Sequence, residues 1–481
     1  MGHLHIFLIP MIAHGHMIPT LDMAKLLTSR GLITTIISTP AFSEPIRKAQ
    51  NSGFSIGLKI IKFPPEKSHL PSNIVSLDQV TSDDLIPKFF KALSLLQEPL
   101  EKLIQELSPN CLISDMFLPW TNCCAAKFNI PRLVFHGISY LSLCCSEQMR
   151  RHRPFDKVLS DSEQFVLPNL PHEMKFVRTQ VSDHLLDQNE FTEIMQQVRD
   201  SDWESYGVVV NSFYELEPDY AHYYKRVLGR KAWNIGPLLL YNQGDKGNTE
   251  RGKKSSIDAH ECLAWLDTKQ ANSVVYVCFG SMVNFTRAQL NEIAYGLEAS
   301  GQDFIWVVRK REDEEEENDE FLPKGFADRL RGRGLIIRGW APQVVILGHI
   351  AIGAFVTHCG WNSTLEGVCA GVPMVTWPLF AEQFFNEKLV TEVLRIGAPV
   401  GSKTWRRVGS EGVDRDAVAK AVEVVMAASE MRSRVGYYKE MAGKAVGEGG
   451  SSYDDMSALI EDLSACSHAK ERTIEMDGQR N

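Results

Sequence analysis

The feature that most constrains the fold is an alternation of short apolar runs with longer helical patterns, which occurs twice along the chain. In the first half, the runs His5–Ile9, Leu32–Ser38 and Cys111–Ser114 are apolar at nearly every position, and helical patterns separate them. Strands that are apolar on both faces are typical of a parallel sheet covered by helices on both sides. The sequence therefore predicts an α/β fold built on parallel sheets.

A second alternation begins near residue 259, with apolar runs at Ser273–Phe279, Phe304–Val308 and Gly353–Thr357. Between the two halves lies the segment Tyr241–Ser256, which is polar, Gly-rich and without apolar periodicity, as exposed linkers are. We therefore expect one domain over residues 1–240, a linker over 241–258 and a second domain over 259–455.

Charge and cysteine usage narrow the class of protein. The net charge is −9, so the chain lacks the basic footprint of a protein that binds nucleic acid or anionic lipid. The ten cysteines show no regular spacing, which favours reduced thiols and a cytoplasmic protein. The apolar segment Leu4–Ala13 is shorter than the roughly 20 residues that span a bilayer, and no longer one follows. We expect no integral membrane segment and a monomer, and we interpret the acidic run Glu312–Glu320 as a solvated loop.

Two candidate catalytic residues follow predicted strands. Gly15 permits a tight turn after the first strand, and His16 then lies where Pro19 opens a helix, facing the expected cleft. Asp115 ends another strand among apolar neighbours, where an unpaired carboxylate is costly. Its partner is either the start of a helix at Leu118 or beyond, or a histidine at a neighbouring strand end such as His16. Spacing alone leaves both open.

The segment Trp340–Gln383 contains the largest group of candidate binding residues. A strand ends at Thr357 and is followed by His358-Cys359-Gly360-Trp361-Asn362-Ser363-Thr364 and then a helix. Gly360 allows a sharp turn, and Asn, Ser and Thr are favoured N-cap residues. A helix N-terminus fed by a strand is a ready anion site, with diphosphate as the natural anion, although a plain capped helix gives the same pattern.

Other nucleotide and metal signatures are missing or weak. No GxGxxG follows a strand and no GxxxxGK[ST] occurs, which argues against a dinucleotide dehydrogenase and a P-loop ATPase. Asp414-Arg415-Asp416 has a form that can hold a cation, but it precedes a helical pattern and is better explained as helix-start carboxylates. His14 and His16 have no carboxylate or thiolate close in sequence, so we predict no metal site.

These residues also carry a family resemblance. The segment Trp340–Gln383 resembles the signature box of plant family 1 UDP-glycosyltransferases, through WAPQ, THCGWNSTLEG, GVP and the closing Gln. GHMIP at Gly15–Pro19, SDMF at Ser114–Phe117, FHG at Phe135–Gly137 and FGS at Phe279–Ser281 extend it over nearly the whole chain. Within the family the chain is most similar to the phenylpropanoid and flavonoid glucosyltransferase group.

The resemblance implies the GT-B fold, in which two Rossmann-like domains face each other across a cleft. The acceptor would bind in the N-terminal domain and the UDP-sugar in the C-terminal domain, with a C-terminal helix and polar tail, residues 456–481, returning to the first domain. The implied reaction is inverting, metal-independent transfer of glucose from UDP-glucose to a hydroxyl of a small lipophilic acceptor, a plant phenolic or flavonoid. UDP-glucose is then a substrate, and no cofactor is expected. The alternatives are a triterpenoid or steroid glucosyltransferase and, from another class, a non-catalytic UDP-sugar-binding protein.

The resemblance also implies roles for single residues. His16 would be the general base, and Asp115 would orient its ring. Thirteen positions in all follow from the family pattern, and the eleven that contact the donor divide by the part of the donor they contact: Trp340, Ala341, Gln343 and Glu366 for the nucleoside; His358, Asn362, Ser363 and Ser281 for the diphosphate; Trp361, Glu382 and Gln383 for the sugar. Glu382 departs from the Asp that the family often has there, and Gln383 is similar to the glucose-using members. The residues after FHG, Gly137 to Ser139, also depart from the pattern and receive no role.

Overall fold

The structure is a computed structural model, and it describes residues 4–242, 252, 255–308, 322–330, 332–406, 408–410 and 412–478. The acidic run Glu312–Glu320 and most of the predicted linker lie outside the described residues.

The first half of the chain forms a seven-stranded sheet with the order β3-β2-β1-β4-β5-β8-β9, in which all neighbours are parallel. Central strands are buried on both faces, which is why their sequences are apolar at nearly every position. The strands are β1 His5–Ile9, β2 Ile33–Ser38, β3 Ile56–Ile60, β4 Cys111–Asp115, β5 Arg132–His136, β8 Gly207–Val210 and β9 Ala232–Asn234.

The second half forms a six-stranded parallel sheet with the order β13-β12-β10-β14-β15-β16. Its strands are β10 Val274–Cys278, β12 Asp303–Val308, β13 Gly334–Arg338, β14 Ile352–Thr357, β15 Met374–Thr376 and β16 Gly397–Pro399. Two small ribbons complete the strand set: β6 Gln164–Leu167 with β7 Met174–Val177, and β11 Asn284–Phe285 with β17 Val408–Ser410.

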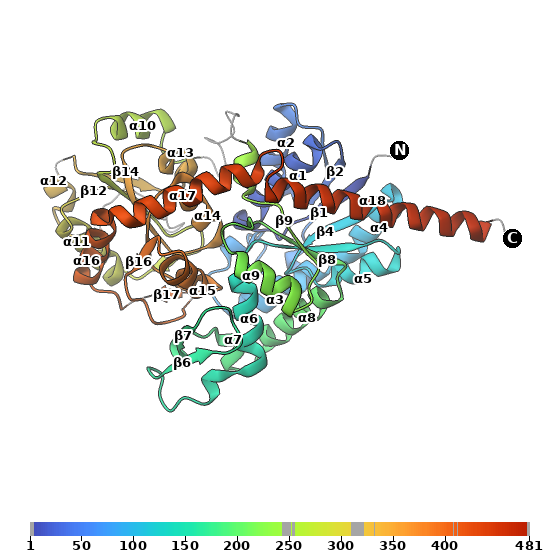
Figure 1. Cartoon of the computed structure of the whole chain (residues 1–481), viewed down its shortest axis with the longest axis horizontal. Coiled ribbons are helices and arrows are strands. Elements are labelled where there is room, and N and C mark those ends of the chain that lie inside the picture. Colours follow the sequence, from blue (N-terminus) through green and yellow to red (C-terminus); the bar gives the residue numbers. More distant parts are fainter. Residues whose placement is uncertain are drawn as a thin grey trace.

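Helices alternate with the strands along the chain and pack around both sheets (Figure 1). In the first half they are α1 His14–Ser29, α2 Ser43–Asn51, α3 Leu85–Ser94, α4 Gln97–Leu107, α5 Trp120–Lys127, α6 Tyr140–His152, α7 Asp183–Leu186, α8 Glu190–Glu204 and α9 Pro218–His222. In the second half they are α10 Ala259–Asp267, α11 Arg287–Ala299, α12 Phe326–Leu330, α13 Gln343–Leu347, α14 Trp361–Ala370, α15 Gln383–Lys388, α16 Arg415–Ala427, α17 Ser429–Val446 and α18 Ser451–Gly478.

The helical pattern over residues 85–107 forms two helices, α3 and α4, where the sequence suggests one. The break falls at Leu95 and Leu96. Pro99 explains it, because a proline ring clashes with the carbonyl of the residue four positions earlier, here Leu95.

The last two helices cross from one half of the molecule to the other. Figure 1 shows α17 over the second half and α18 continuing across the first. Several side-chain contacts hold α18 there; among them, Tyr206 Oη donates to Asp462 at 2.9 Å, Asn110 Nδ2 donates to Ser467 at 2.9 Å, and Lys225 pairs with Asp455 at 3.1 Å. The helix begins at Ser451, ahead of the position 456 expected from the sequence. Among the described residues, none of the helices is long and apolar enough to cross a membrane.

The two halves meet around one cleft of about 2150 Å³, which residues of both sheets line. Two side chains at the start of α14 reach the first half. Asn362 Nδ2 donates to the Gly15 carbonyl at 2.6 Å, and Trp361 Nε1 donates to the Asn211 carbonyl at 2.8 Å. These bonds join α14 to the first turn of α1, which follows β1, and to the loop after β8, so the candidate residues of the two halves face a shared space.

Candidate active site

His16 and Asp115 form a hydrogen-bonded pair at the edge of the first sheet. Strands β1 and β4 are neighbours, with Ile9 opposite Ser114, so the residues after β1 lie beside the end of β4. The distance from His16 Nδ1 to Asp115 Oδ2 is 2.6 Å. The other oxygen, Oδ1, accepts the backbone N–H of Phe117 at 3.0 Å. Of the two partners that the sequence left open for Asp115, the structure has the histidine, and α5 begins only at Trp120 with Pro119 as its N-cap.

The surroundings of this pair determine which nitrogen of His16 carries a hydrogen, and they shift the pKa of the ring. Asp115 is 3% exposed and, as a carboxylate, can only accept, so Nδ1 carries a hydrogen and, in the neutral ring, Nε2 has the lone pair. Burial by itself lowers the pKa of His16. The charge and hydrogen bond of Asp115, together with the charges of Asp78 and Glu382, outweigh burial and raise this pKa above its usual 6.5. In its neutral form His16 is therefore a base with enhanced affinity for a proton.

A second histidine–aspartate pair lies beside the first, and sequence reasoning missed it. His14 Nδ1 lies 2.5 Å from Asp78 Oδ2, which also accepts the backbone N–H of His14 at 3.0 Å. The other oxygen of Asp78 accepts the hydroxyl of Ser281 at 3.0 Å. Ser281 belongs to the second half of the chain, so Asp78 joins the two halves at the candidate diphosphate position. Asp78 lies in a short 3₁₀ turn, Leu77–Gln79, that no periodic pattern marks.

The candidate nucleoside residues form a connected group at the carboxyl end of β13. Gln343 Nε2 donates to Glu366 Oε2 at 2.6 Å and to Ser363 Oγ at 3.0 Å, while its Oε1 accepts the hydroxyl of Tyr276 at 3.2 Å. Trp340 borders the cleft next to Ala341, which is 7% exposed, and the Trp340 ring centroid lies 5.9 Å from that of His14. In this arrangement the Trp340 ring can stack on a nucleotide base, and the Glu366 carboxylate, held by Gln343, can bind ribose hydroxyls.

The start of α14 faces the cleft, but its predicted caps have other partners. Gly360 is the N-cap, and among the described residues no side chain caps this helix. Asn362 bonds to Gly15 instead, and Ser363 bonds to Gln343. The first-turn N–H groups of an α-helix have no intrahelical acceptor, and the helix dipole adds positive potential there. The α14 N-terminus can therefore receive an anion.

His358 lies between two glycines at the same end of the cleft. Burial lowers its pKa to about 4, so the ring is neutral near pH 7. Its buried Nδ1 has no hydrogen-bond partner among the described residues. A Cβ on Gly280 would lie 2.8 Å from His358 Cε1, and one on Gly360 would lie 2.5 Å from Nε2. The ring is fixed by close backbone approach and can offer one hydrogen bond to a ligand.

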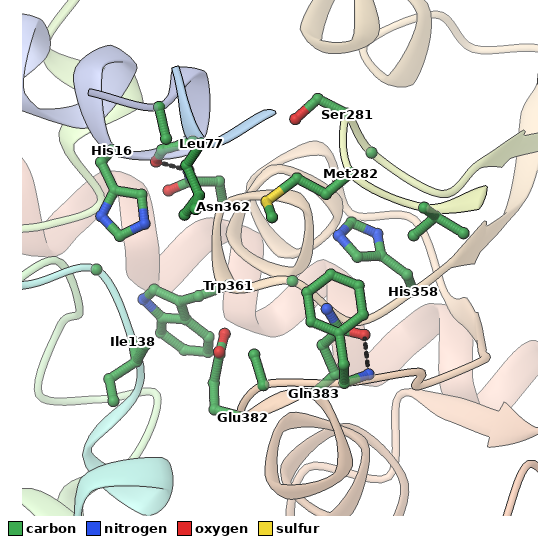
Figure 2. A pocket seen from close by; sticks show the side chains of 18 of the residues that line it. His16, Leu77, Ile138, Ser281, Met282, His358, Trp361, Asn362, Glu382 and Gln383 are labelled. Carbon is green, nitrogen blue, oxygen red and sulfur yellow. Dashed lines mark hydrogen bonds between the residues drawn. The ribbon is translucent and has the colours of Figure 1, made fainter. Parts of the chain in front are cut away.

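The candidate sugar residues lie at the starts of two helices: Trp361 is the first residue of α14, Glu382 is the N-cap of α15 and Gln383 is its first residue. Figure 2 shows Trp361, Glu382 and Gln383 on one side of the pocket, with His16 and Asn362 opposite. Burial raises the pKa of Glu382, although backbone N–H groups, the charge of His16 and a hydrogen bond from Asn386 act against this. Gln383 Oε1 accepts the N–H groups of Leu379 and Phe380, at 2.9 and 3.1 Å. The side-chain carbonyl of Gln383 therefore holds the loop at Leu379 and Phe380, and its Nε2 group is the part that would contact the sugar.

The Asp-x-Asp motif lies away from this site. Asp414 is the N-cap of α16, and its Oδ1 accepts the N–H of Ala417 at 2.8 Å. Within the described part of the chain, no group of three or more His, Cys, Asp or Glu side chains could hold a metal ion.

Two parallel-sheet domains around one cleft, with a histidine–aspartate pair on one side and a helix N-terminus on the other, have the GT-B architecture of sugar-nucleotide transferases. The family of UDP-glucoronosyl and UDP-glucosyl transferases matches residues 63–430. A scopoletin glucosyltransferase of Nicotiana tabacum is 59% identical, over 97% of this chain and 99% of its own length. An anthocyanin 3'-O-beta-glucosyltransferase of Gentiana triflora is 52% identical, over 97% of this chain and 100% of its own length.

Solved structures of plant glycosyltransferases have the same fold. Glycyrrhiza uralensis UGT73P12, complexed with glycyrrhetinic acid 3-O-monoglucuronide, superposes with a TM-score of 0.91 at 41% identity, covering 100% of this chain and 99% of that one. Medicago truncatula UGT71G1, complexed with UDP-glucose, has a TM-score of 0.79 at 27% identity, covering 96% and 98%. The chain belongs to the UDP-glucuronosyl and UDP-glucosyl transferase family and is a UDP-glycosyltransferase.

Proposed function

We propose that this enzyme transfers glucose from UDP-glucose to a hydroxyl of a small phenolic acceptor, with inversion at the anomeric carbon and without a metal ion. The observation that carries the proposal is the His16–Asp115 pair at 2.6 Å, which lies in the cleft opposite the α14 N-terminus. The glucosyltransferase relatives, which act on scopoletin and anthocyanin by name, support glucose and phenols as substrates.

In the proposed step, the acceptor oxygen forms a bond to the anomeric carbon as the bond from that carbon to the diphosphate oxygen breaks. The acceptor proton passes to His16 Nε2, the bonding pair leaves with UDP, and Asp115 stabilises the resulting imidazolium. A phenol with a pKa of ~10 and a histidine near ~6.5 differ by about 3.5 units, or roughly 5 kcal/mol. An aliphatic alcohol, close to water at ~15.7, would face roughly 12 kcal/mol. The raised pKa of His16 narrows both gaps, and phenols remain the easier acceptors.

Charge develops on the departing UDP, and the second domain supplies the groups that offset it. The N-terminus of α14, together with Asn362, Ser363, Ser281 and neutral His358, would bind the diphosphate. Trp340 would stack on uracil, with Gln343 and Glu366 at the ribose. Glu382 and the Gln383 amide would bind the sugar hydroxyls beside Trp361.

The wall of the cleft next to His16 favours a flat aromatic acceptor. Phe117 lies 5.8 Å from the His16 ring and 5.8 Å from Phe90, which in turn lies 6.0 Å from Phe191. A row of aromatic rings in edge and tilted contact offers faces on which a phenolic ring can stack. A triterpenoid is the second candidate, because the similar Glycyrrhiza uralensis structure holds glycyrrhetinic acid 3-O-monoglucuronide.

We also propose that residues 1–240 bind the acceptor and residues 259–455 bind the donor, with the C-terminal helix packed on the first domain. All ten cysteines are free thiols, which supports a reducing, cytoplasmic location. We propose a monomer as the working form, which size-exclusion chromatography with light scattering tests directly.

The test of the reaction is UDP release from UDP-glucose by the purified enzyme, with a panel of phenolics, flavonoids and triterpenoids, with and without EDTA. We expect release that depends on the acceptor, survives EDTA and is fastest with phenols. Binding of UDP-glucose with no release for any acceptor would favour a non-catalytic binding protein, and loss of release in EDTA would contradict the metal-independent mechanism.

A further inference from the structure

Asn386 is a fully buried amide between the two domains, close to the candidate sugar site. It lies on α15, four residues after Glu382, and is 0% exposed. Its Nδ2 donates to the Cys359 carbonyl at 2.8 Å and to Glu382 Oε1 at 3.2 Å. Its Oδ1 accepts from the hydroxyls of Ser139 and Ser142, at 3.0 and 2.9 Å. All four hydrogen-bonding positions of the amide are therefore used.

These partners allow only one orientation of the amide. The Cys359 carbonyl and the Glu382 carboxylate can only accept, so the NH₂ group must face them. A reversed amide would place its oxygen against two acceptors in a buried site, where unmade hydrogen bonds are costly. The serine hydroxyls, which can donate or accept, donate to Oδ1 in this orientation. Cys359 and Glu382 therefore set the orientation of the amide, and the two serines of the first domain hold its oxygen in place.

Ser139 and Ser142 belong to the acceptor side of the cleft. Ser139 is the N-cap of α6, and its side chain also accepts the N–H of Ser142 at 3.0 Å. Both serines are 0% exposed. They follow Ile138, which lines the cleft and is labelled in Figure 2. Ser139 is one of the residues after FHG that received no role in the sequence analysis.

Two backbone segments near Asn386, at Cys359 and at Ala381, are held in an unusual conformation. Cys359, whose carbonyl Asn386 binds, has φ 64°, and Ala381, which precedes Glu382, has φ 53°. Residues other than glycine rarely adopt this left-handed region, and they persist there only where the surroundings enforce it. The indole of Trp405 donates to the Ala381 carbonyl at 3.3 Å. The loop that presents Glu382 is thus fixed from several directions, with Asn386 bonding to the carboxylate itself.

We propose that Asn386 is a positioning residue that aims the Glu382 carboxylate at the sugar, and that Ser139 and Ser142 hold the Asn386 side chain in place from the acceptor domain. This inference rests on the proposed function, because it takes Glu382 to bind sugar hydroxyls. It follows that the sugar contact is complete only when the two domains are docked. The nucleoside contacts come from other residues, whereas the bond from Asn386 to the Cys359 carbonyl lies next to His358 and the start of α14, where the diphosphate would bind.

The test compares binding of UDP-glucose with binding of UDP by titration calorimetry on the full chain. The variants are Ser139→Ala/Ser142→Ala, which frees the amide oxygen, and Asn386→Asp, which keeps the shape but replaces the donor with an acceptor. We expect the ratio of UDP-glucose affinity to UDP affinity to fall about tenfold in both, as for loss of one hydrogen bond to a charged group. In the serine variant, which leaves the bond to the Cys359 carbonyl in place, UDP affinity itself should stay within about twofold, whereas a merely structural defect would lower both affinities together.

Two further variants separate the possible failures. Thr376→Val is the matched control, because it removes a buried hydroxyl bond of 2.7 Å to Glu387, the residue next to Asn386, and should leave the ratio unchanged. Glu382→Gln should lower the ratio by itself, and combining it with the double serine change should add little more. An unchanged ratio in Glu382→Gln would overturn the proposed sugar role of Glu382. A lowered ratio there, with no effect of the serine change, would overturn the role of Asn386 alone.

Discussion

Replacing Asp115 with Asn isolates the contribution of the carboxylate to catalysis, because the side chain keeps its shape. Asp115 is buried, and its bond to His16 is short, at 2.6 Å. A hydrogen bond to a charged group contributes about 1.5–3 kcal/mol, so its loss alone slows the step about 10- to 150-fold. Asn also offers an N–H to His16 Nδ1, which moves the ring proton to Nε2 and removes the lone pair that faces the acceptor. Adding this wrong tautomer brings the expected loss in kcat to about 10²–10⁴-fold.

The pH dependence of kcat/KM shows in which direction the pKa of His16 moves when Asp115 is replaced. His16 must be unprotonated to act as a base, so activity falls as pH falls through its pKa. Asp115 raises that pKa, and removing the charge must lower it. The acid limb of the profile should therefore move to lower pH in Asp115→Asn, while UDP-glucose affinity and the melting temperature stay near wild type. Asp202→Asn, which changes another carboxylate facing a histidine, His136 at 3.3 Å, should leave the limb in place. Turnover within about threefold of wild type, or an acid limb that does not move, would refute the role assigned to Asp115.

Three other substitutions test separate parts of the cleft. His16→Ala should abolish transfer but leave UDP-glucose binding nearly intact, and it should cost more than Asp115→Asn; a variant that kept more than about a tenth of the turnover would exclude His16 as the base. Trp340→Ala should weaken UDP binding roughly 5- to 150-fold in calorimetry, the range expected for loss of one base–aromatic stack at about 1–3 kcal/mol, and equal affinity would show that the indole does not stack on uracil. Gly280→Ala should lower diphosphate affinity, because its Cβ would meet His358 at 2.8 Å and its φ of 75° disfavours a side chain; unchanged UDP binding would mean that the position of His358 is unimportant to the donor.

The sequence allowed prediction of the features that depend on short stretches of chain. Strands buried on both faces are apolar throughout, so both sheets could be predicted without any alignment. His16 and Asp115 could be paired as a hypothesis because parallel neighbours bring their carboxyl ends to one edge. The helix break at Leu95 was missed although Pro99 signals it, because the apolar periodicity continues through it.

Contacts between the domains could not be predicted in this way. The bond from Ser281 to Asp78 joins a loop of the second sheet to a 3₁₀ turn of the first, 203 positions apart in sequence. Asn386 had one signal, its place four residues after Glu382 on the same helical face, but its serine partners lie 247 and 244 positions away. Hydrogen bonds of this kind depend on how the two domains dock, and the periodicity of a short segment carries no information about that.

The domain docking also explains how a cleft with several carboxylates can take an anionic donor. Asp78, Asp115, Glu366 and Glu382 all line or border the site, and isolated negative charges would repel a diphosphate. Each has a donor already in place: His14 and Ser281 for Asp78, His16 for Asp115, Gln343 for Glu366 and Asn386 for Glu382. Their charge is thus held by the protein, while the N–H groups at the start of α14 remain for the ligand. Of these carboxylates, only Asp115 bonds directly to His16, whereas Asp78 and Glu382 act on it through space and raise its pKa in the same direction. The carboxylates around the proposed donor site therefore also increase the basicity of His16, the group proposed to take the acceptor proton.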